Sequence, residues 1–327
     1  MSGTELYAPH NPRYRRTWSA AIVIIGLMFT LFGPLLALSP YIFHLVMEAR
    51  TLGGADRLPD PELLDPPVLA LIIGYSLYII FIYLWVRVFE RRSLSDLGLS
   101  APVLKRIGQG YLMGCLYLTV VIAIISGLGG YQIQSAGIWH APNPAGLVTL
   151  LLYALMFLIQ GSSEELWMRG WLMSNLASRH GLISAVVVNS LVFAGLHIFT
   201  HATLLSKLLG ITNVALFGGF LSLYALRAGS IWGVCGFHAA WNWMMGVGFG
   251  LEVTGLKLRI TPLFTGLNER AGEPWWLTGG HWGAEASLVT TGVLLAGIVW
   301  HILKGALKAK NLYSSGDNKP VRASMHS

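Results

Sequence analysis

Long apolar runs recur along most of this chain. A helix that crosses the hydrocarbon core of a bilayer needs about 20 predominantly apolar residues. Eight segments meet this requirement: 18–39, 68–89, 107–129, 146–168, 182–200, 208–227, 230–249 and 286–304. Because backbone polar groups in lipid must be hydrogen-bonded within the protein, such runs favour helices. The sequence therefore predicts an all-α polytopic membrane protein, a bundle of about eight transmembrane helices.

The composition agrees with this class. Hydrophobic residues make up 54% of the 327 residues and charged residues 11%, whereas soluble domains carry about a quarter charged residues. The two cysteines lie in apolar runs, which indicates neither a disulfide framework nor a cysteine metal site. The net charge of +7 comes from basic residues between apolar runs. This placement is typical of membrane orientation, so no nucleic-acid partner is expected.

The chain is interpreted as one membrane domain, residues 18–310, in a bacterial inner membrane. A cytoplasmic segment, 1–17, precedes it, and a disordered cytoplasmic tail, 311–327, follows it. Basic residues flank the first span and the C-terminal end, whereas the third connection, 130–145, has none. Since basic residues concentrate on the cytoplasmic side, both termini are expected there. No cleavable signal peptide is expected, because the polar N-terminus is followed by a long apolar run.

The long connection 250–285 is expected on the outer side of the membrane. Apolar and polar residues partly alternate between 251 and 266, which predicts short strand-like segments.

Charged residues directly follow the fourth apolar run, in "GSSEELWMRG", 161–170. Ionisable groups at this depth are costly, usually face a bundle interior and mark function. Glu165 and Arg169 are four residues apart, in the order that favours an ion pair on a helix. Arg169 is therefore expected to neutralise Glu165. Glu164 points about 100° away, which makes it the candidate for chemistry.

Two later spans carry histidines that could meet Glu164. His197 ends the motif "FAGLH", and His238 and Asn242 are four residues apart in "HAAWN", so the last two share a helix face. A chain reversal near 179–181 would place Glu164 and His197 at similar depth, roughly 22–27 Å from the turn. In the seventh helix, His238 and Asn242 lie only roughly 12–18 Å from the same membrane side. The hairpin of the fourth and fifth helices is therefore expected to tilt or to project beyond the membrane.

These residue types suit hydrolysis. A carboxylate and an imidazole can remove a proton from water, and a second imidazole with an amide can donate hydrogen bonds to an oxyanion. Glu164, His197 and His238 could instead hold a divalent metal such as Zn²⁺, although the HExxH spacing is absent. His201 is four residues after His197, a spacing that can hold a metal, but it is interpreted as an interfacial histidine.

At these motifs the sequence resembles the membrane-embedded CAAX protease and bacteriocin-processing family, which includes the type II prenyl-protein endopeptidases. The family motifs EExxxR, FxxxH and HxxxN correspond to Glu164–Arg169, Phe193–His197 and His238–Asn242, and the resemblance covers roughly 145–245. The segment 91–100, "RRSLSDLGLS", is also similar to a feature of bacterial members.

The resemblance implies an eight-helix bundle that acts as an intramembrane endopeptidase. Glu164 would be the base that activates water with His197, and His238 and Asn242 would stabilise the oxyanion. Glu165 and Arg169 would support the helix. Both a metal-dependent and a metal-free glutamate mechanism are compatible with the resemblance.

The predicted function is hydrolysis of a membrane-associated peptide or protein in the lipid bilayer, and the sequence indicates no oligomeric state. The active site is expected to open toward the cytoplasm, where the 179–181 turn is placed. One alternative is a proton-coupled transporter, which usually shows an internal repeat with interrupted spans; none is evident. The other is a non-catalytic membrane scaffold or immunity protein, which would tolerate Glu164→Gln.

Overall fold

The computed structural model describes Tyr7 and residues 66–142, 144–198, 203–258 and 260–307. The expected first span and the C-terminal tail lie outside these residues.

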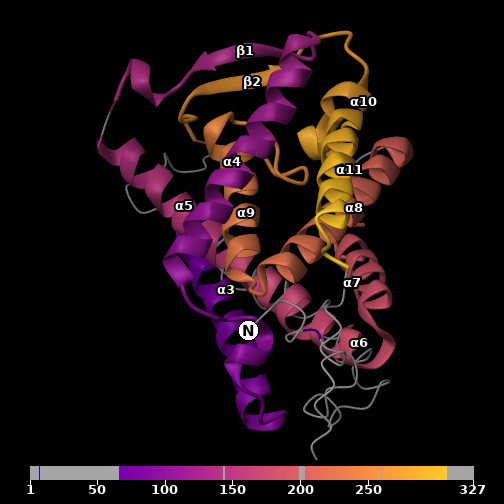
Figure 1. Cartoon of the computed structure of the whole chain (residues 1–327). Helices are drawn as coiled ribbons and strands as arrows, with labels where there is room; N and C mark the ends of the chain where they lie inside the picture. The colour runs from indigo at the N-terminus through magenta and orange to yellow at the C-terminus, as the bar shows by residue number, and fades with distance from the viewer. Residues whose placement is uncertain (1–6, 8–65, 143, 199–202, 259, 308–327) are drawn as a thin grey trace, which may run out of the picture.

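Helices make up most of the described chain (Figure 1). The elements in the first half are α3 (Pro66–Leu84), η2 (Trp85–Phe89), η3 (Leu94–Leu97), α4 (Val103–Gly127), β1 (Tyr131–Ala136), η4 (Ile138–His140), α5 (Pro144–Glu165) and η5 (Leu166–Leu172). Those in the second half are α6 (Met173–His180), α7 (Leu182–Gly195), α8 (Leu204–Ala228), α9 (Trp232–Trp243), η6 (Met244–Gly248), β2 (Thr265–Glu269), α10 (Trp275–Thr278), η7 (Gly280–Trp282), η8 (Ala284–Ala286) and α11 (Leu288–Leu303).

The predicted class is confirmed, but the count of eight spanning helices is not. Within the described residues, four helices are long and apolar enough to cross a membrane: Val68–Phe89, Val103–Gly127, Pro144–His180 and Leu204–Ala228. α7 and α11 are apolar but have only 14 and 16 residues. The sequence estimate was too long for the fifth span, because the helix ends at Gly195, before His197.

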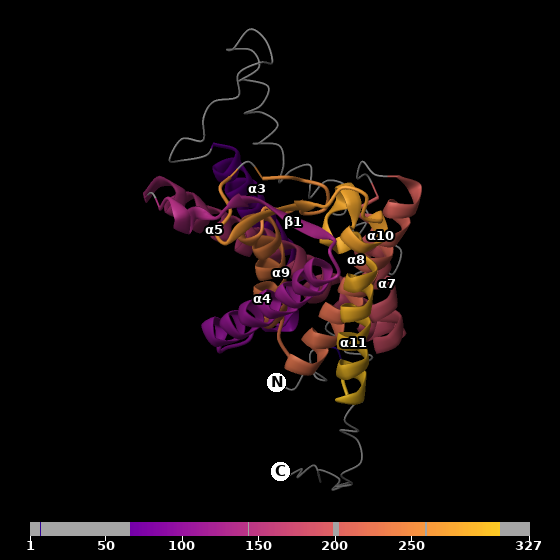
Figure 2. The same ribbon diagram turned by 90° about the horizontal axis from the view of Figure 1, so that it is seen from above.

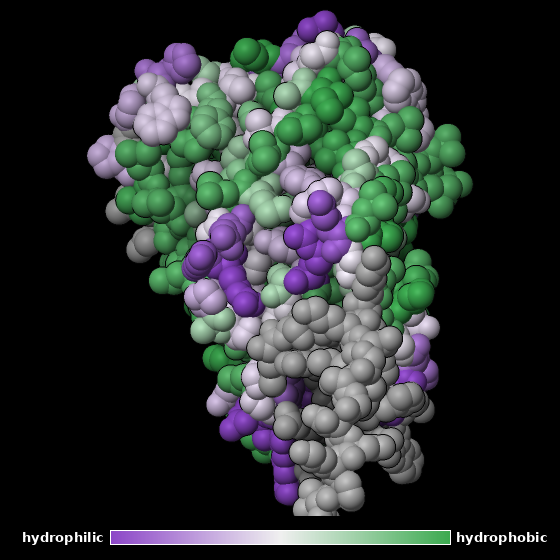
Figure 3. Space-filling view, viewed as in Figure 1, coloured by the Kyte–Doolittle hydropathy of each residue, from purple (hydrophilic) through white to green (hydrophobic). Residues whose placement is uncertain are grey.

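The helices form three neighbouring groups. Figures 1 and 2 show α3 and α5 on one side, α4 and α9 in the middle, and α7, α8 and α11 on the other side. Apolar side chains cover much of the face in Figure 3. Leucines on three of these helices are more than half exposed, namely Leu112, Leu151 and Leu191, as expected for a surface that faces lipid tails.

A two-stranded antiparallel sheet closes one end of the bundle (Figure 1). β1 pairs with β2 from Tyr131 opposite Glu269 to Ala136 opposite Thr265, with an irregularity between Ile133 and Ser135. The predicted strand-like character of 251–266 is confirmed in part, since Val253 bridges Leu256 and β2 begins at Thr265. β1 was not predicted, because its partner lies far along the chain.

Helix α9 is pressed against α4 through glycines. A Cβ atom on Gly110 would overlap the carbonyl of Gly233, one on Gly114 that of Phe237, and one on Gly236 that of Ile107. Small residues let membrane helices approach closely and gain van der Waals contact. All residues from Gly233 to Asn242 are buried, so the position of α9 is tightly determined.

Gly110→Ala is expected to destabilise the protein by about 1–3 kcal/mol, because overpacking forces the two helices apart. The matched control is Gly108→Ala on the same helix, where nothing lies within 4 Å of the added atom. The control should be neutral or stabilising, since alanine favours a helix by about 1 kcal/mol over glycine. Thermal unfolding midpoints of the detergent-solubilised variants measure this. Equal midpoints would contradict the close crossing of α4 and α9.

Candidate active site

Two of the three helices that carry the polar motifs change pitch next to them. α5 ends at Glu165 and continues as the π-helical segment η5, Leu166–Leu172, whose residues are all buried. α9 likewise continues as the π-helical segment η6, which begins two residues after Asn242. Such segments are rare and occur often at functional sites. They change the direction of side chains relative to a regular helix.

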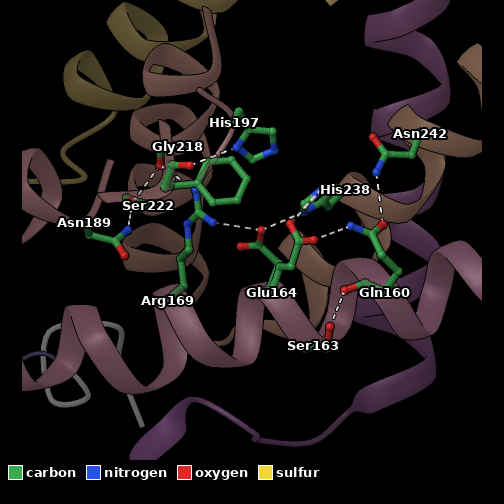
Figure 4. A network of polar contacts seen from close by, with 12 residues as sticks. Gln160, Ser163, Glu164, Arg169, Asn189, His197, Gly218, Ser222, His238 and Asn242 are labelled. Carbon is green, nitrogen blue, oxygen red and sulfur yellow. Dashed lines mark hydrogen bonds and ion pairs between the residues drawn. The ribbon is translucent and has the colours of Figure 1, made fainter. Parts of the chain in front are cut away.

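Glu165 is fully buried and binds two partners through one oxygen. Its Oε1 accepts hydrogen bonds from Arg169 Nη1 at 2.9 Å and lies 2.8 Å from His238 Nδ1 (Figure 4). The predicted ion pair with Arg169 is therefore confirmed. The contact with His238 was not predicted, and it gives Glu165 a second role, because it fixes the orientation of that imidazole ring.

Arg169 is held by three further contacts. Its Nη2 donates to the Gly218 carbonyl at 3.1 Å, and its guanidinium lies 4.7 Å from the centre of the Phe193 ring. The Tyr7 hydroxyl donates to the Arg169 carbonyl at 2.9 Å. Tyr7 is buried, so this residue of the expected N-terminal segment packs in the core beside the site.

Glu164 is more accessible than its neighbour, with 22% of its side chain exposed against none for Glu165. Its Oε1 accepts a hydrogen bond from Gln160 Nε2 at 2.6 Å, and its Oε2 lies 3.9 Å from His238 Nε2. Asn242 Nδ2 donates to Gln160 Oε1 at 3.1 Å. The structure thus brings Glu164, His238 and Asn242 together, with Gln160 between the first and the last.

His197 joins this group through Phe193. Its Nδ1 is 2.9 Å from the Phe193 carbonyl, and the two rings lie 5.0 Å apart. The Phe193 ring also meets the His238 ring edge-on at 6.0 Å. The predicted chain reversal is confirmed between α6 and α7, where Gly181 has a φ of +81°.

Figure 4 shows the polar contacts as one continuous network. It runs from Asn189, Ser222 and Gly218 to Arg169, and from Arg169 through the Glu165 carboxylate to His238. From His238 it continues past Glu164 to Gln160 and Asn242. Asn189 Nδ2 donates to Ser222 Oγ at 3.0 Å, and Ser222 donates to the Gly218 carbonyl at 2.7 Å. This end of the network holds the carbonyl that receives Arg169.

The metal alternative named Glu164, His197 and His238 as candidate ligands. In the part of the chain that the structure describes, no group of three or more His, Cys, Asp or Glu side chains could hold a metal ion. The Nδ1 of His238 is engaged by Glu165, and its Nε2 lies 3.9 Å from Glu164 Oε2. His201, the other histidine considered, lies outside the described residues.

Sequence reasoning missed three participants. Gln160 could have been found, because it is a polar residue in an apolar run and lies one turn before Glu164. Phe217, whose ring is 5.3 Å from that of His238, resembles any other aromatic residue of a span. The Gly218 carbonyl belongs to the main chain, so no residue type indicates it.

Comparison with protein families supports the resemblance seen in the sequence. Residues 136–244 match the family model described as "Type II CAAX prenyl endopeptidase Rce1-like". The matched segment contains all three motifs and covers about a third of the chain. No curated protein and no solved structure matches the chain.

Arg169→Met is expected to destabilise the protein by about 3–5 kcal/mol, because it leaves the buried Glu165 carboxylate without its guanidinium partner. The double variant Glu165→Gln with Arg169→Met should recover much of this loss, since replacement of both members of a buried pair is often close to neutral. Thermal midpoints in detergent measure both effects.

Lys257→Met supplies the control for this prediction. Its ammonium group is 3.4 Å from Glu252 Oε1, but the side chain is 46% exposed. An exposed pair contributes within about 1 kcal/mol. If Arg169→Met costs no more than Lys257→Met, the ion pair with Glu165 does not support the site.

Proposed function

We propose that the chain is an intramembrane endopeptidase that cleaves a membrane-associated peptide or protein. The observation that carries the proposal is the pairing of two differently placed glutamates around one histidine. Glu165 is enclosed and orients His238 through Nδ1, whereas the accessible Glu164 faces Nε2 of the same ring. The Rce1-like match over residues 136–244 supports the same reaction class.

Glu164 is the proposed general base. The 3.9 Å between its Oε2 and His238 Nε2 is too long for a direct hydrogen bond, so Oε2 can accept a proton from an attacking water. Glu164 Oε2 takes a proton from this water while the water oxygen attacks the peptide carbonyl carbon. The same carboxyl group later gives the proton to the leaving amine, so that the C–N bond breaks into a carboxylic acid and an amine.

His197 is proposed to hold the attacking water together with Glu164. A carbonyl oxygen only accepts hydrogen bonds, so the Nδ1 of His197, which lies against the Phe193 carbonyl, carries its proton. In the neutral ring, Nε2 is then an acceptor. In this tautomer, His197 can accept a hydrogen bond from the attacking water and so orient the lone pair of the water oxygen toward the substrate.

His238 and Asn242 are proposed to stabilise the oxyanion. His238 donates a hydrogen bond from Nδ1 to the ionised Glu165. When the ring carries both protons, its Nε2 is a second donor and points to the substrate oxygen. Asn242 uses one amide N–H on Gln160 and directs the other toward the substrate oxygen. Donors aimed at a developing negative charge typically contribute about 3–4 kcal/mol each to the lowering of the barrier.

Glu164→Gln is expected to abolish cleavage, because an amide cannot accept the proton of the attacking water. We would compare the neo-termini of membrane and secreted proteins in cells that carry the native chain or the variant at matched abundance. Glu269→Gln, at an exposed position of β2, is the matched control. A small set of termini should be lost in Glu164→Gln alone, and these termini would identify the substrate.

Other outcomes of the comparison would contradict the proposal. Identical termini with a preserved cellular phenotype would indicate a non-catalytic scaffold. Identical termini with a lost phenotype would instead favour proton-coupled transport through Glu164.

Removal of divalent metal ions is expected to leave cleavage unchanged, because the proposed steps involve only side chains of the chain itself. The purified protein would be treated with a strong zinc chelator and assayed on the precursor identified by its neo-terminus. A loss of activity that added Zn²⁺ restores would overturn this mechanism and favour the metal-dependent alternative.

A further inference from the structure

Gln160 connects two groups that come from different helices. It lies one turn before Glu164 on α5 and reaches Asn242 on α9 (Figure 4). Its Nε2 donates to Glu164 Oε1 at 2.6 Å, and its Oε1 accepts from Asn242 Nδ2 at 3.1 Å. A side-chain amide has one donor end and one acceptor end. The carboxylate on one side and the amide donor on the other therefore specify a single orientation of Gln160.

The contact with Glu164 selects which carboxylate oxygen is used. A hydrogen bond to an ionised carboxylate is shorter and stronger than one between neutral groups. With Oε1 held by Gln160, Oε2 is the oxygen that faces His238 Nε2 at 3.9 Å. The rotamer of the base thus depends on the amide of Gln160.

The contact between Gln160 and Asn242 also fixes the orientation of the Asn242 side-chain amide. The Gln160 oxygen can only accept, so the NH₂ end of Asn242 must point toward it. The alternative orientation of Asn242 would place two amide oxygens against each other. The second N–H of Asn242 is therefore presented in a fixed direction.

The fold does not need Gln160 to hold α5 and α9 together. Glu165 binds His238 between the same helices, and Trp243 Nε1 donates to the Leu150 carbonyl at 3.2 Å. A Cβ on Gly161 would lie 3.1 Å from the backbone nitrogen of Ala239, so the backbones are already in close contact there. Loss of the Gln160 amide should change side-chain geometry rather than helix packing.

We infer that Gln160 is a positioning residue that couples the base Glu164 to the oxyanion donor Asn242. The inference rests on the proposed peptidase function. The two groups act on different reactants in the same step. Glu164 deprotonates the attacking water, and Asn242 stabilises the carbonyl oxygen of the substrate, which becomes negative as the water attacks. The bridge keeps both in register.

The test is a double-mutant cycle with Gln160→Met and Asn242→Ala. Methionine has nearly the length of glutamine but lacks the amide, so it removes both hydrogen bonds and retains volume. The purified protein in detergent would be assayed on the precursor whose neo-terminus depends on Glu164. Gln134→Met, at an exposed position of β1, is the matched control and should cleave at the native rate.

Gln160→Met is expected to lower kcat by about 10- to 100-fold, because small misplacements of reacting groups have effects of this size. KM and the thermal midpoint should stay close to native, which separates positioning from a loss of folding. The double variant should be little slower than Asn242→Ala alone, since residues that act as a unit show non-additive effects.

Three results would overturn the inference. If Gln160→Met has the native kcat while Glu164→Gln is inactive, Gln160 has no positioning role, and the proposed peptidase function still holds. Multiplicative losses in the double variant would show that Gln160 and Asn242 act independently. Full activity of Glu164→Gln, or no Glu164-dependent neo-terminus, would refute the proposed function itself and the inference with it.

Discussion

A carboxylate buried in an apolar helical bundle is the constraint on which this architecture depends. Glu165 is inaccessible to solvent, and one of its oxygens receives both Arg169 and His238. A charge in such surroundings is tolerated only if it is paired and hydrogen-bonded. Because its partners lie on η5 and α9, the requirement to neutralise Glu165 fixes those two segments relative to each other. Arg169 extends this requirement to α7 and α8 through Phe193 and Gly218.

Close backbone packing and buried polar groups complement each other in this arrangement. The glycines between α4 and α9 let the two backbones come into direct contact but supply no side-chain hydrogen bonds. The polar network orients side chains but contributes little to the contact area between the helices. Packing therefore decides where α9 lies, and Glu165 decides which way its histidine faces.

Sequence patterns predicted the features that depend on local spacing. The pair Glu165 and Arg169 follows from a separation of four residues, and the polar residues of three spans indicated a shared interior site. The double use of Glu165 could not be foreseen, because a carboxylate with one local partner gives no sign of a second, distant one. Strand β1 and the end of α7 at Gly195 were also missed. The first needs a partner far along the chain, and the second falls at a glycine inside an apolar run, where glycines also occur within spanning helices.

The pairing of β1 with β2 has a consequence for the organisation of the whole chain. Ala136 lies opposite Thr265, and the residues that carry the motifs all fall between these two positions. The segment therefore begins and ends at the same place, as the termini of an insertable domain often do. Lengthening of the chain before β1 or after β2 does not alter the distance between these two ends. The connections next to β1 and β2 can thus vary in length without separating the two ends of this segment, whereas α4 is tied to it by the glycine contacts with α9.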